Sequence, residues 1–516
     1  MLYALNFTNI KALQTLRLYK LSYYINFEHS NFIDLANFLV HLRFINFWTK
    51  ISKNIHLANF MQRVHFIAIG GAAMHNLAIA ISKKANFQVT GSDDEIFEPS
   101  LSRLKEHKLL PEKLGWFPDR IHKGLHAVIL GMHATEDNPE LIRAKELGLK
   151  IFSFPEYLFQ QTRSKTRIVI GGSHGKTTTT AMILFVLKQL RIDADYMVGA
   201  QIEGFDNMVK LSYESRIAVF EGDEYLTSPI DRRPKFHLYK PHIAVLTGIA
   251  WDHINVFPTF ENYVEQFKKF TELMEVQGRL IYFDGDENLN EIAKHLRRDI
   301  VPFPYNTPEY EIIDGITFLK TKKGDVQLKI FGEHNLQNMN AARLACRQIG
   351  VTDEQFYSVI SDFPGASNRL QKIAETTTSV AYKDFAHSPS KLRATVKAVK
   401  HQYPDRKLVA CMELHTFSSL TEDFLPQYAA CMAEADVAFV YFNPEVIQHK
   451  HLKEIQPVQV KKAFGGSNLT VYTDSNALQQ KLRELNYDNS VLLLMTSGNF
   501  SGVNLIEFAN ELLKSK

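Results

Sequence analysis

An apolar segment runs into a glycine-rich loop at Arg167-Ile168-Val169-Ile170-Gly171-Gly172-Ser173-His174-Gly175-Lys176-Thr177. Its first four residues predict a strand, and the apolar spacing of Met182, Phe185 and Leu190 after the loop predicts a helix. Glycines in such a loop let backbone amides curl around phosphate oxygens, and the helix N-terminus adds the positive end of its dipole. This order of elements indicates a phosphate-binding site in an α/β domain.

The loop also carries side chains that suit a nucleotide. Lys176 would place a positive charge on the β- and γ-phosphates, and Thr177 would offer a hydroxyl to Mg²⁺. Ile170 stands where the general phosphate-loop pattern has its first glycine, so a glycine-rich turn without a ligand is the alternative. A Lys-Thr pair at the start of a helix favours nucleotide binding. The predicted nucleotide-binding residues here are Gly172, Ser173, His174, Gly175, Lys176, Thr177 and Thr178.

Three α/β blocks follow one another along the chain, at residues 61–163, 164–363 and 364–516. In each block short apolar strands alternate with helical patterns, which is typical of parallel, doubly wound sheets. A length of 516 residues suits three or four domains. The expected strands are Val64–Ile69, Phe87–Thr90, Ala127–Leu130, Arg167–Ile170, Ile217–Phe220, Ile243–Thr247, Arg279–Phe283, Val380–Tyr382, Leu408–Met412, Val437–Val440 and Val491–Met495.

The composition sets limits on partners and compartment. Hydrophobic residues make up 45% and charged residues 22%, and a net charge of +3 gives no support for binding to nucleic acid or to a membrane. The three cysteines, Cys346, Cys411 and Cys431, are far apart and lack metal-ligand spacing. This cysteine pattern fits a reduced, cytoplasmic protein best. No apolar run is long enough to span a bilayer.

Residues 1–60 differ from the rest of the chain. They are rich in Asn and Phe, contain few acids and have almost no Gly or Pro. A targeting peptide is one interpretation, because basic, acid-poor leaders have such compositions. Met61 directly precedes a good first strand, however, and we favour the interpretation that translation starts there. Residues 1–60 would then be an extension outside the fold.

A series of motifs after Met61 resembles, in the same order, the motifs of the Mur ligases of bacterial cell-wall synthesis. The phosphate loop has their short form, Gly-Ser/Thr-x-Gly-Lys-Thr. The series in family order is far more specific than any one motif. The other matching segments are Ile69-Gly70-Gly71-Ala72-Ala73-Met74, Glu221-Gly222-Asp223-Glu224-Tyr225, Trp251-Asp252-His253, Gly332-Glu333-His334-Asn335-Leu336-Gln337-Asn338, Arg369-Leu370 and Asp384-Phe385-Ala386-His387.

The resemblance implies a three-domain α/β Mur ligase architecture. Residues 61–163 would form a Rossmann-like UDP-binding domain, residues 164–363 a central phosphate-loop ATPase domain, and residues 364–516 a C-terminal Rossmann-like ligase domain. The implied enzyme uses ATP and Mg²⁺. A substrate carboxylate attacks the γ-phosphate of MgATP, and an amine then attacks the acyl phosphate to form an amide. This chemistry needs no protein nucleophile, so the cysteines would be spectators.

Acidic residues near the phosphate loop are the predicted metal ligands. Glu221 follows the strand Ile217–Phe220, and a carboxylate at the carboxyl end of a strand suits Mg²⁺. By resemblance, Thr177 and Glu221 hold Mg²⁺ and His253 holds a second ion, with a satisfied loop histidine as the alternative for His253. Two interpretations are open for Asp223 and Glu224: they are hydrogen-bond partners of these ligands, or they are solvated acids.

The segment after Gly332 carries the implied adenine contacts. Asn335 and Asn338 share a helix face, where side-chain amides can pair with the adenine edge, and His334 lies beside them. Helix capping by Asn335 is the alternative.

The last block carries three residues with implied roles. Arg369 would neutralise the γ-phosphate as it leaves, Asp384 would accept from the ribose hydroxyls, and His387 would lie near the reacting groups. Many family members have a second histidine where Ser388 stands, so no catalytic role is expected at that position. The predicted catalytic residues are Lys176, Arg369 and His387.

The first block is expected to bind the sugar nucleotide. The turn at Gly70 and Gly71 suits a diphosphate, and Ser92-Asp93 ends the next strand, where a ribose or uracil contact is usual. His75-Asn76 occupies the positions that would carry the third glycine of a dinucleotide fingerprint, which counts against NAD. The resemblance makes the ligand UDP-N-acetylmuramate.

The acceptor depends on the loop Tyr225–Phe236. One branch of the family attaches L-alanine, and another attaches the tripeptide L-alanyl-γ-D-glutamyl-meso-diaminopimelate during wall recycling. The loop resembles the recycling branch, and Arg232, Arg233 or Lys235 would meet the extra carboxylates of a tripeptide, although a solvated basic loop is the alternative. We therefore expect the tripeptide, with L-alanine as the alternative acceptor.

Two other functions fit parts of the sequence. A Mur-like nucleotide-binding regulator without catalysis is one, but intact Lys176, Glu221 and Arg369 argue against it. Folate polyglutamation is the other, and the glycine-rich opening at Gly70 disfavours it because the folate enzymes lack the UDP domain.

Overall fold

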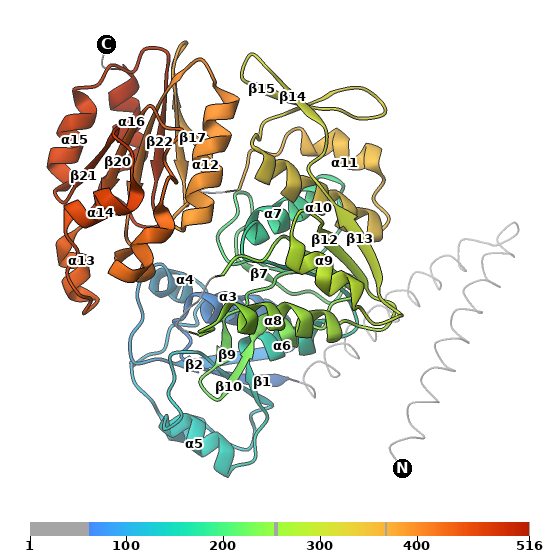
Figure 1. Ribbon diagram of the computed structural model, residues 1–516. Coiled ribbons are helices and arrows are strands. Elements are labelled where there is room, and N and C mark those ends of the chain that lie inside the picture. The colour runs from blue at the N-terminus through green and yellow to red at the C-terminus, as the bar shows by residue number, and fades with distance from the viewer. Residues whose placement is uncertain (1–60, 252–255, 367–368, 515–516) are drawn as a thin grey trace, which may run out of the picture. The chain divides into compact units, whose positions relative to one another are not determined.

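The computed structural model describes residues 61–251, 256–366 and 369–514 (Figure 1). The interpretation of residues 1–60 and the predicted ligand His253 lie outside these residues. No helix in the described parts of the chain is both long and apolar enough to cross a membrane.

The first sheet has four strands in the order β2-β1-β3-β4. Strand β3 pairs in parallel with both β1 and β4, as expected for a doubly wound block. Its core includes Ile67, Val128, Leu130 and Leu141. Its elements are β1 (Gln62–Ile67), α3 (Ala72–Ser82), β2 (Phe87–Ser92), α4 (Ser100–Glu106), η2 (Pro118–Arg120), β3 (Ala127–Leu130), α5 (Pro139–Glu146), β4 (Ile151–Ser153) and α6 (Phe154–Thr162).

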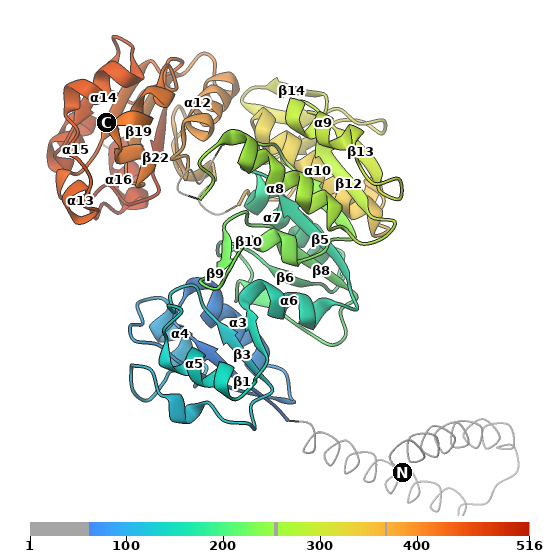
Figure 2. The same cartoon turned by 60° about the horizontal axis from the view of Figure 1, so that its bottom comes forward.

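The central sheet has seven strands in the order β13-β12-β11-β5-β8-β6-β7, and Figure 2 shows β5, β8 and β6 side by side. All of its neighbouring strands are parallel except the edge pair β6–β7. Its strands are β5 (Thr166–Gly171), β6 (Asp195–Met197), β7 (Val209–Lys210), β8 (Ile217–Glu221), β11 (Ile243–Leu246), β12 (Arg279–Phe283) and β13 (Val301–Tyr305). Its helices are α7 (Lys176–Gln189), η3 (Lys235–Leu238), α8 (Phe260–Glu272), α9 (Glu287–Lys294), α10 (Glu333–Gln348) and α11 (Asp353–Ile360).

Helices α7 and α10 pack on one face of this sheet. Ile168 and Ile170 of β5 belong to the same buried cluster as Ile183 of α7 and Met339 of α10. Cys346 lies in that cluster as a free thiol, so it is a core residue.

Two small antiparallel sheets were not predicted. They are the hairpin β9 (Leu226–Ser228) with β10 (Asp231–Pro234), and the sheet β14 (Tyr310–Ile313), β15 (Ile316–Leu319) and β16 (Val326–Leu328). Asp314 and Gly315 connect β14 to β15, and their φ angles are 52° and 73°. Asp-Gly between apolar runs is a known hairpin signal, so this hairpin could have been predicted from the sequence.

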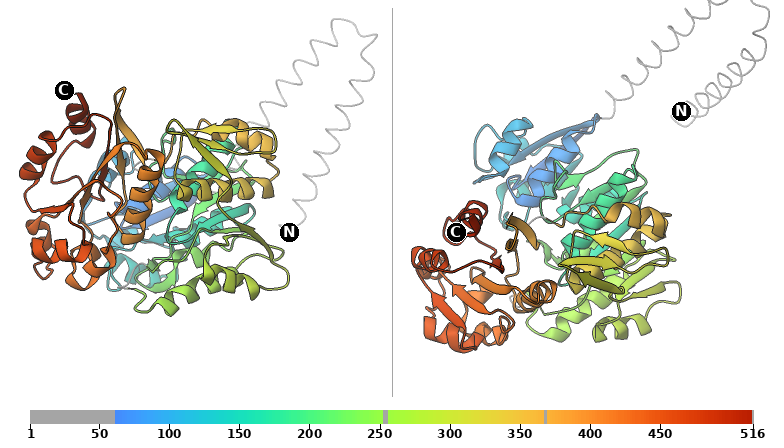
Figure 3. Two further views of the ribbon diagram at one scale, coloured as in Figure 1. Left: turned by 45° about the horizontal axis from the view of Figure 1, so that its top comes forward. Right: turned by 90° about the horizontal axis from the view of Figure 1, so that it is seen from above.

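The C-terminal sheet has six strands in the order β17-β18-β22-β19-β20-β21, with only β17 antiparallel to its neighbour. Along β22, Leu492 and Leu494 belong to one buried cluster, whereas Val491 and Leu493 belong to another. Both faces are therefore covered, and Figures 1 and 3 show helices on both sides of these orange and red strands. The strands are β17 (Gln371–Glu375), β18 (Val380–Asp384), β19 (Lys407–Glu413), β20 (Val437–Tyr441), β21 (Leu469–Tyr472) and β22 (Ser490–Met495). The helices are α12 (Pro389–Gln402), η4 (Ser418–Leu420), η5 (Glu422–Tyr428), α13 (Pro444–His449), α14 (Pro457–Phe464), α15 (Ser475–Arg483) and α16 (Leu505–Lys514).

Candidate active site

The phosphate loop lies between β5 and α7, as predicted. Gly172 and Gly175 have φ angles of 128° and 79°, which side chains other than glycine rarely adopt. A Cβ atom on Gly172 would overlap Thr247, and one on Gly175 would overlap Asn338. Backbone conformation and close packing therefore both require glycine at these two positions.

Lys176 opens α7 and is held at the loop by two groups. Its Nζ donates to the Gly172 carbonyl at 2.6 Å and to both carboxylate oxygens of Glu224, at 3.0 and 2.8 Å. Burial by itself would lower the pKa of Lys176, but the nearby carboxylates, Glu224 first, hold it above its usual value. Lys176 is thus a fixed cation at the mouth of the loop.

Glu224 is fully buried, so it is not a solvated acid. Asp223 is different, because its side chain is 37% exposed and accepts from Lys235 Nζ at 2.6 Å. Partial burial opposes ionisation of Asp223, but Lys235 and Lys176 lower its pKa below the usual value. The sequence did not decide between a structural partner and a solvated acid for either residue. The structure pairs Glu224 with Lys176 and Asp223 with Lys235.

Glu221 and Thr177 meet at the carboxyl edge of the central sheet. Thr177 Oγ1 donates to Glu221 Oε1 at 2.8 Å, and the Gly199 amide donates to Glu221 Oε2 at 2.8 Å. A hydroxyl and a carboxylate are hard oxygen donors of the kind that Mg²⁺ prefers, so the residues present fit this ion. When bound, Mg²⁺ would supply positive charge to the phosphate oxygens.

Strand order explains how these residues converge. Strand β5 lies between β8 and β11, with Ile170 paired to Glu221 and Gly171 paired to Leu246. Since all three strands are parallel, the residues that follow them lie at one edge of the sheet. This geometry brings Lys176, Thr177 and Glu221 together.

The predicted adenine residues lie in the first two turns of α10. Asn335 is not a cap, because Gly332 is the N-cap residue and Asn335 Nδ2 donates to the Phe331 carbonyl at 2.9 Å. Asn338 packs against Gly175 of the phosphate loop. Burial lowers the pKa of His334 to about 4, so its ring is neutral at neutral pH.

The predicted residues of the last block gather at the carboxyl end of β18. The Arg369 guanidinium lies over the Phe385 ring, 5.0 Å from its centroid. Asp384 is buried, which raises the pKa of its carboxyl, and its Oδ2 accepts from the Leu370 amide at 2.6 Å. His387 Nδ1 lies 3.0 Å from the Phe385 carbonyl oxygen.

Ser388, which stands at the position of the second family histidine, is the N-cap residue of α12 without a side-chain cap bond. Its hydroxyl is buried and has no hydrogen-bond partner in the described parts of the chain.

The predicted sugar-nucleotide residues form a small cluster at the start of α3. The Gly70 amide donates to Asp93 Oδ2 at 2.6 Å, and Gly71 is the N-cap residue of α3. Burial raises the pKa of Asp93. Ser92 is buried, and Arg120 donates to its hydroxyl at 3.4 Å. Asp93 Oδ2 therefore stabilises the turn at Gly70 through this hydrogen bond.

The predicted acceptor loop is the hairpin β9–β10. Arg233 Nη2 lies 2.5 Å from Asp231 Oδ2 and 3.5 Å from Glu156 Oε1. Exposed Arg232 has no side-chain hydrogen bond or ion pair with any residue that the structure describes. The two arginines therefore differ, since only Arg233 is already neutralised.

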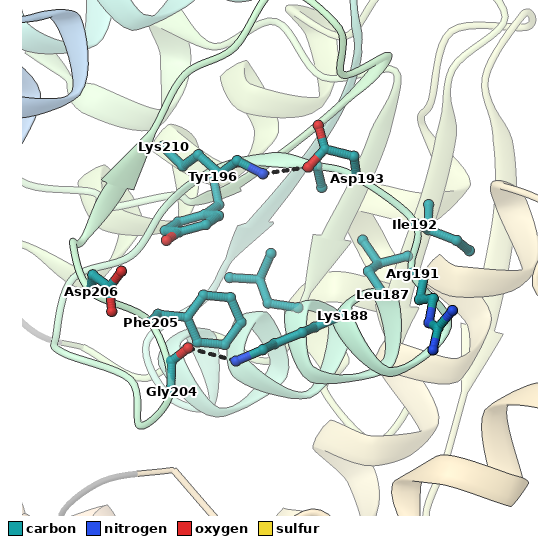
Figure 4. A pocket seen from close by; sticks show the side chains of 12 residues that line it. Leu187, Lys188, Arg191, Ile192, Asp193, Tyr196, Gly204, Phe205, Asp206 and Lys210 are labelled. Atoms are coloured by element: carbon teal, nitrogen blue, oxygen red, sulfur yellow. Dashed lines mark hydrogen bonds and ion pairs between the residues drawn. The ribbon is translucent and has the colours of Figure 1, made fainter. Parts of the chain in front are cut away.

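A pocket of about 360 Å³ lies at the other end of α7 (Figure 4). Lys188, Tyr196 and Phe205 line it, and Lys188 Nζ donates to the Gly204 carbonyl at 2.6 Å. None of the predicted site residues lines this pocket, so it is separate from the phosphate loop.

Tyr263 of α8 also contacts this site, and the sequence did not indicate it. Its hydroxyl donates to Glu224 Oε1 at 2.8 Å and lies 3.0 Å from Ser173 Oγ. No local pattern distinguishes Tyr263 from an ordinary core aromatic residue, because its contacts are with residues 39 and 90 positions away.

Comparison with known proteins gives two family matches. The Mur ligase middle domain matches residues 170–346, and the glutamate ligase domain of Mur ligases matches residues 368–498. The UDP-N-acetylmuramate–L-alanine ligase of Caldicellulosiruptor saccharolyticus is 30% identical over 381 residues, which are 71% of this chain and 81% of that relative.

Solved structures agree on the fold. MurC, the UDP-N-acetylmuramate-alanine ligase of Thermotoga maritima, has a TM-score of 0.63 at 20% identity, covering 88% of this chain and 100% of that one. The murein peptide ligase of Psychrobacter arcticus has a TM-score of 0.58 at 21% identity, covering 88% and 99%.

The phosphate loop and these matches define an ATP-dependent amide ligase. The chain belongs to the Mur ligase family, whose members act in peptidoglycan synthesis. The expected fold class and ligase activity are thereby confirmed, and the alternative of a catalytically inactive regulator is set aside.

Proposed function

We propose that this ligase joins UDP-N-acetylmuramate to L-alanyl-γ-D-glutamyl-meso-diaminopimelate. The observation that carries the chemistry is the convergence of Lys176, Thr177 and Glu221 at one edge of the central sheet. The observation that carries the acceptor is Arg232, an exposed cation on β10 without a protein partner among the described residues. A tripeptide with several carboxylates suits such a cation better than L-alanine does.

The reaction has two steps in this proposal. The carboxylate of the muramyl group attacks the γ-phosphorus of ATP, and ADP leaves. The tripeptide amine then attacks the acyl carbon, and the carbon–oxygen bond to phosphate breaks as the nitrogen loses a proton. Lys176 and Arg369 would stabilise negative charge on the phosphate oxygens, and His387 would lie near the reacting groups.

The ligands would be divided among the three blocks. Residues 61–163 would bind the uridine diphosphate at Gly70 and Gly71, with Ser92 and Asp93 beside it. Residues 164–363 would bind ATP through the phosphate loop and α10, with one Mg²⁺ held by Thr177 and Glu221 and a second by His253. Residues 364–516 would supply Arg369 and Asp384, the latter to the ribose.

L-Alanine is the second candidate acceptor, because the relatives at 25–30% identity are UDP-N-acetylmuramate–L-alanine ligases by name. An assay with UDP-N-acetylmuramate, MgATP and either acceptor distinguishes the two. We expect at least a tenfold higher kcat/KM for the tripeptide, because one charge-assisted contact contributes about 1.5–3 kcal/mol. Mass spectrometry of the product identifies the acceptor, and a preference for L-alanine would replace this proposal with the second candidate.

A further inference from the structure

A continuous set of hydrogen bonds joins the phosphate loop to helix α8. The Ala250 amide lies 2.8 Å from Ser173 Oγ, and Ser173 Oγ lies 3.0 Å from the Tyr263 hydroxyl. The Tyr263 hydroxyl lies 2.8 Å from Glu224 Oε1, and Glu224 holds Lys176. We call these five residues the Tyr263 relay.

The direction of every bond in the Tyr263 relay follows from its two ends. A backbone amide can only donate, so Ser173 Oγ accepts from Ala250. An ionised carboxylate can only accept, so the Tyr263 proton points to Glu224. Ser173 must then donate its own proton to the Tyr263 oxygen, and all donors are aligned toward Glu224.

We propose that Tyr263 is a positioning residue for nucleotide binding, which holds Glu224 and Ser173 so that Lys176 faces the phosphates. Glu224 is a buried carboxylate with Tyr263 and Lys176 as its donors. If Tyr263 stops donating, Glu224 depends on Lys176 alone and competes more strongly with a phosphate for that cation. Ser173 loses an acceptor at the same time.

Aromatic packing fixes the ring of Tyr263 and therefore the position of its hydroxyl. It packs against Phe257 and Phe267, with ring centroids 5.4 and 5.2 Å away. Tyr263→Phe therefore removes the relay and keeps the packing. This inference rests on the proposed nucleotide role of Lys176.

The test measures steady-state kinetics of the full chain with MgATP varied. For Tyr263→Phe we expect KM for MgATP to rise about tenfold, the size of one lost hydrogen bond to a charged group. We expect kcat at saturating MgATP and KM for UDP-N-acetylmuramate to change less than about twofold, because none of the five relay residues belongs to the predicted sugar-nucleotide site.

The matched control is Tyr239→Phe. Tyr239 is as buried as Tyr263, but its hydroxyl has no hydrogen-bond partner among the described residues. The same substitution at Tyr239 should leave KM for MgATP unchanged. An equal rise in both variants would overturn the proposal, because it would reflect loss of any buried hydroxyl.

A double-mutant cycle separates positioning from a structural role. In a Glu224→Gln background the carboxylate charge is absent, so adding Tyr263→Phe should change KM for MgATP less than about twofold. A full tenfold effect in that background, or no effect in the wild-type background, overturns the proposal. If Tyr263→Phe does not fold, recovery of folding in the Glu224→Gln background supports the coupling, and no recovery overturns it.

The nucleotide role of Lys176 is tested separately. If the Lys176→Ala/Glu224→Gln variant still binds ATP normally, the proposed function fails. If that variant loses ATP and Tyr263→Phe behaves like wild type, only the inference about Tyr263 fails.

Discussion

Thr177 Oγ1 donates a hydrogen bond to Glu221 Oε1 at 2.8 Å, although the two residues are 44 positions apart in the chain. One stands in the first turn of α7, and the other is the last residue of β8. A hydroxyl and a carboxylate oxygen at this place fit the Mg²⁺ site that we propose.

Thr177→Val keeps the shape of the side chain and removes the hydroxyl. We expect the Mg²⁺ concentration for half-maximal activity to rise at least about tenfold, because the hydroxyl that we propose as a Mg²⁺ ligand is lost. Thr179→Val is the matched control, since Thr179 lies in the same helix with a buried hydroxyl that lacks a partner among the described residues. A magnesium titration that gives equal curves for the two variants would contradict the assignment of Thr177.

Lys176→Ala should abolish ligation and also destabilise the fold. Glu224 would be left buried without its ion-pair partner, which costs about 3–5 kcal/mol in comparable cases. The Lys176→Ala/Glu224→Gln variant should recover the melting temperature without recovering activity. Calorimetric ATP binding and thermal denaturation measure the two effects, and near-normal turnover in the folded double variant would refute the role of Lys176.

Arg232→Ala should lower kcat/KM for the tripeptide about tenfold, because a free cation that meets a substrate carboxylate is lost. Arg233→Ala should have a smaller effect, under about threefold, since Asp231 and Glu156 already neutralise Arg233. Tripeptide kinetics at saturating MgATP test both variants. If Arg233→Ala is the more damaging substitution, the hairpin meets the acceptor differently from what we propose.

His334 should make stability depend on pH between about 6.5 and 4. Its pKa is lowered to about 4 in the folded chain by burial, so the unfolded chain takes up a proton first as the pH falls. As the pH falls from the ordinary histidine pKa to about 4, the free energy of unfolding therefore decreases. Above pH 7 the His334 ring is neutral in both states, so it adds no pH dependence there. Denaturant unfolding of His334→Gln without nucleotide should show a flatter pH profile than wild type, and parallel profiles would show that His334 titrates normally.

The segment around Lys176 could be predicted from the sequence because its information is local. Apolar residues, glycines and a Lys-Thr pair specify strand, turn and helix within eleven positions, and the structure has β5, the loop and α7 there. Eleven expected strands lie close to observed ones for the same reason. The Asp314-Gly315 hairpin was equally local and was overlooked.

Only the tertiary structure decided which polar groups meet. Glu224 could not be told from a solvated acid until β8 and α8 brought it against Lys176 and Tyr263, which lie 48 and 39 positions away in sequence. The difference between Arg232 and Arg233 also appears only when the hairpin places Asp231 and Glu156 beside one of them. Local propensity acts over a few residues, whereas strand order in a parallel sheet brings distant segments together. A buried charge needs a partner, and only this strand order supplies one.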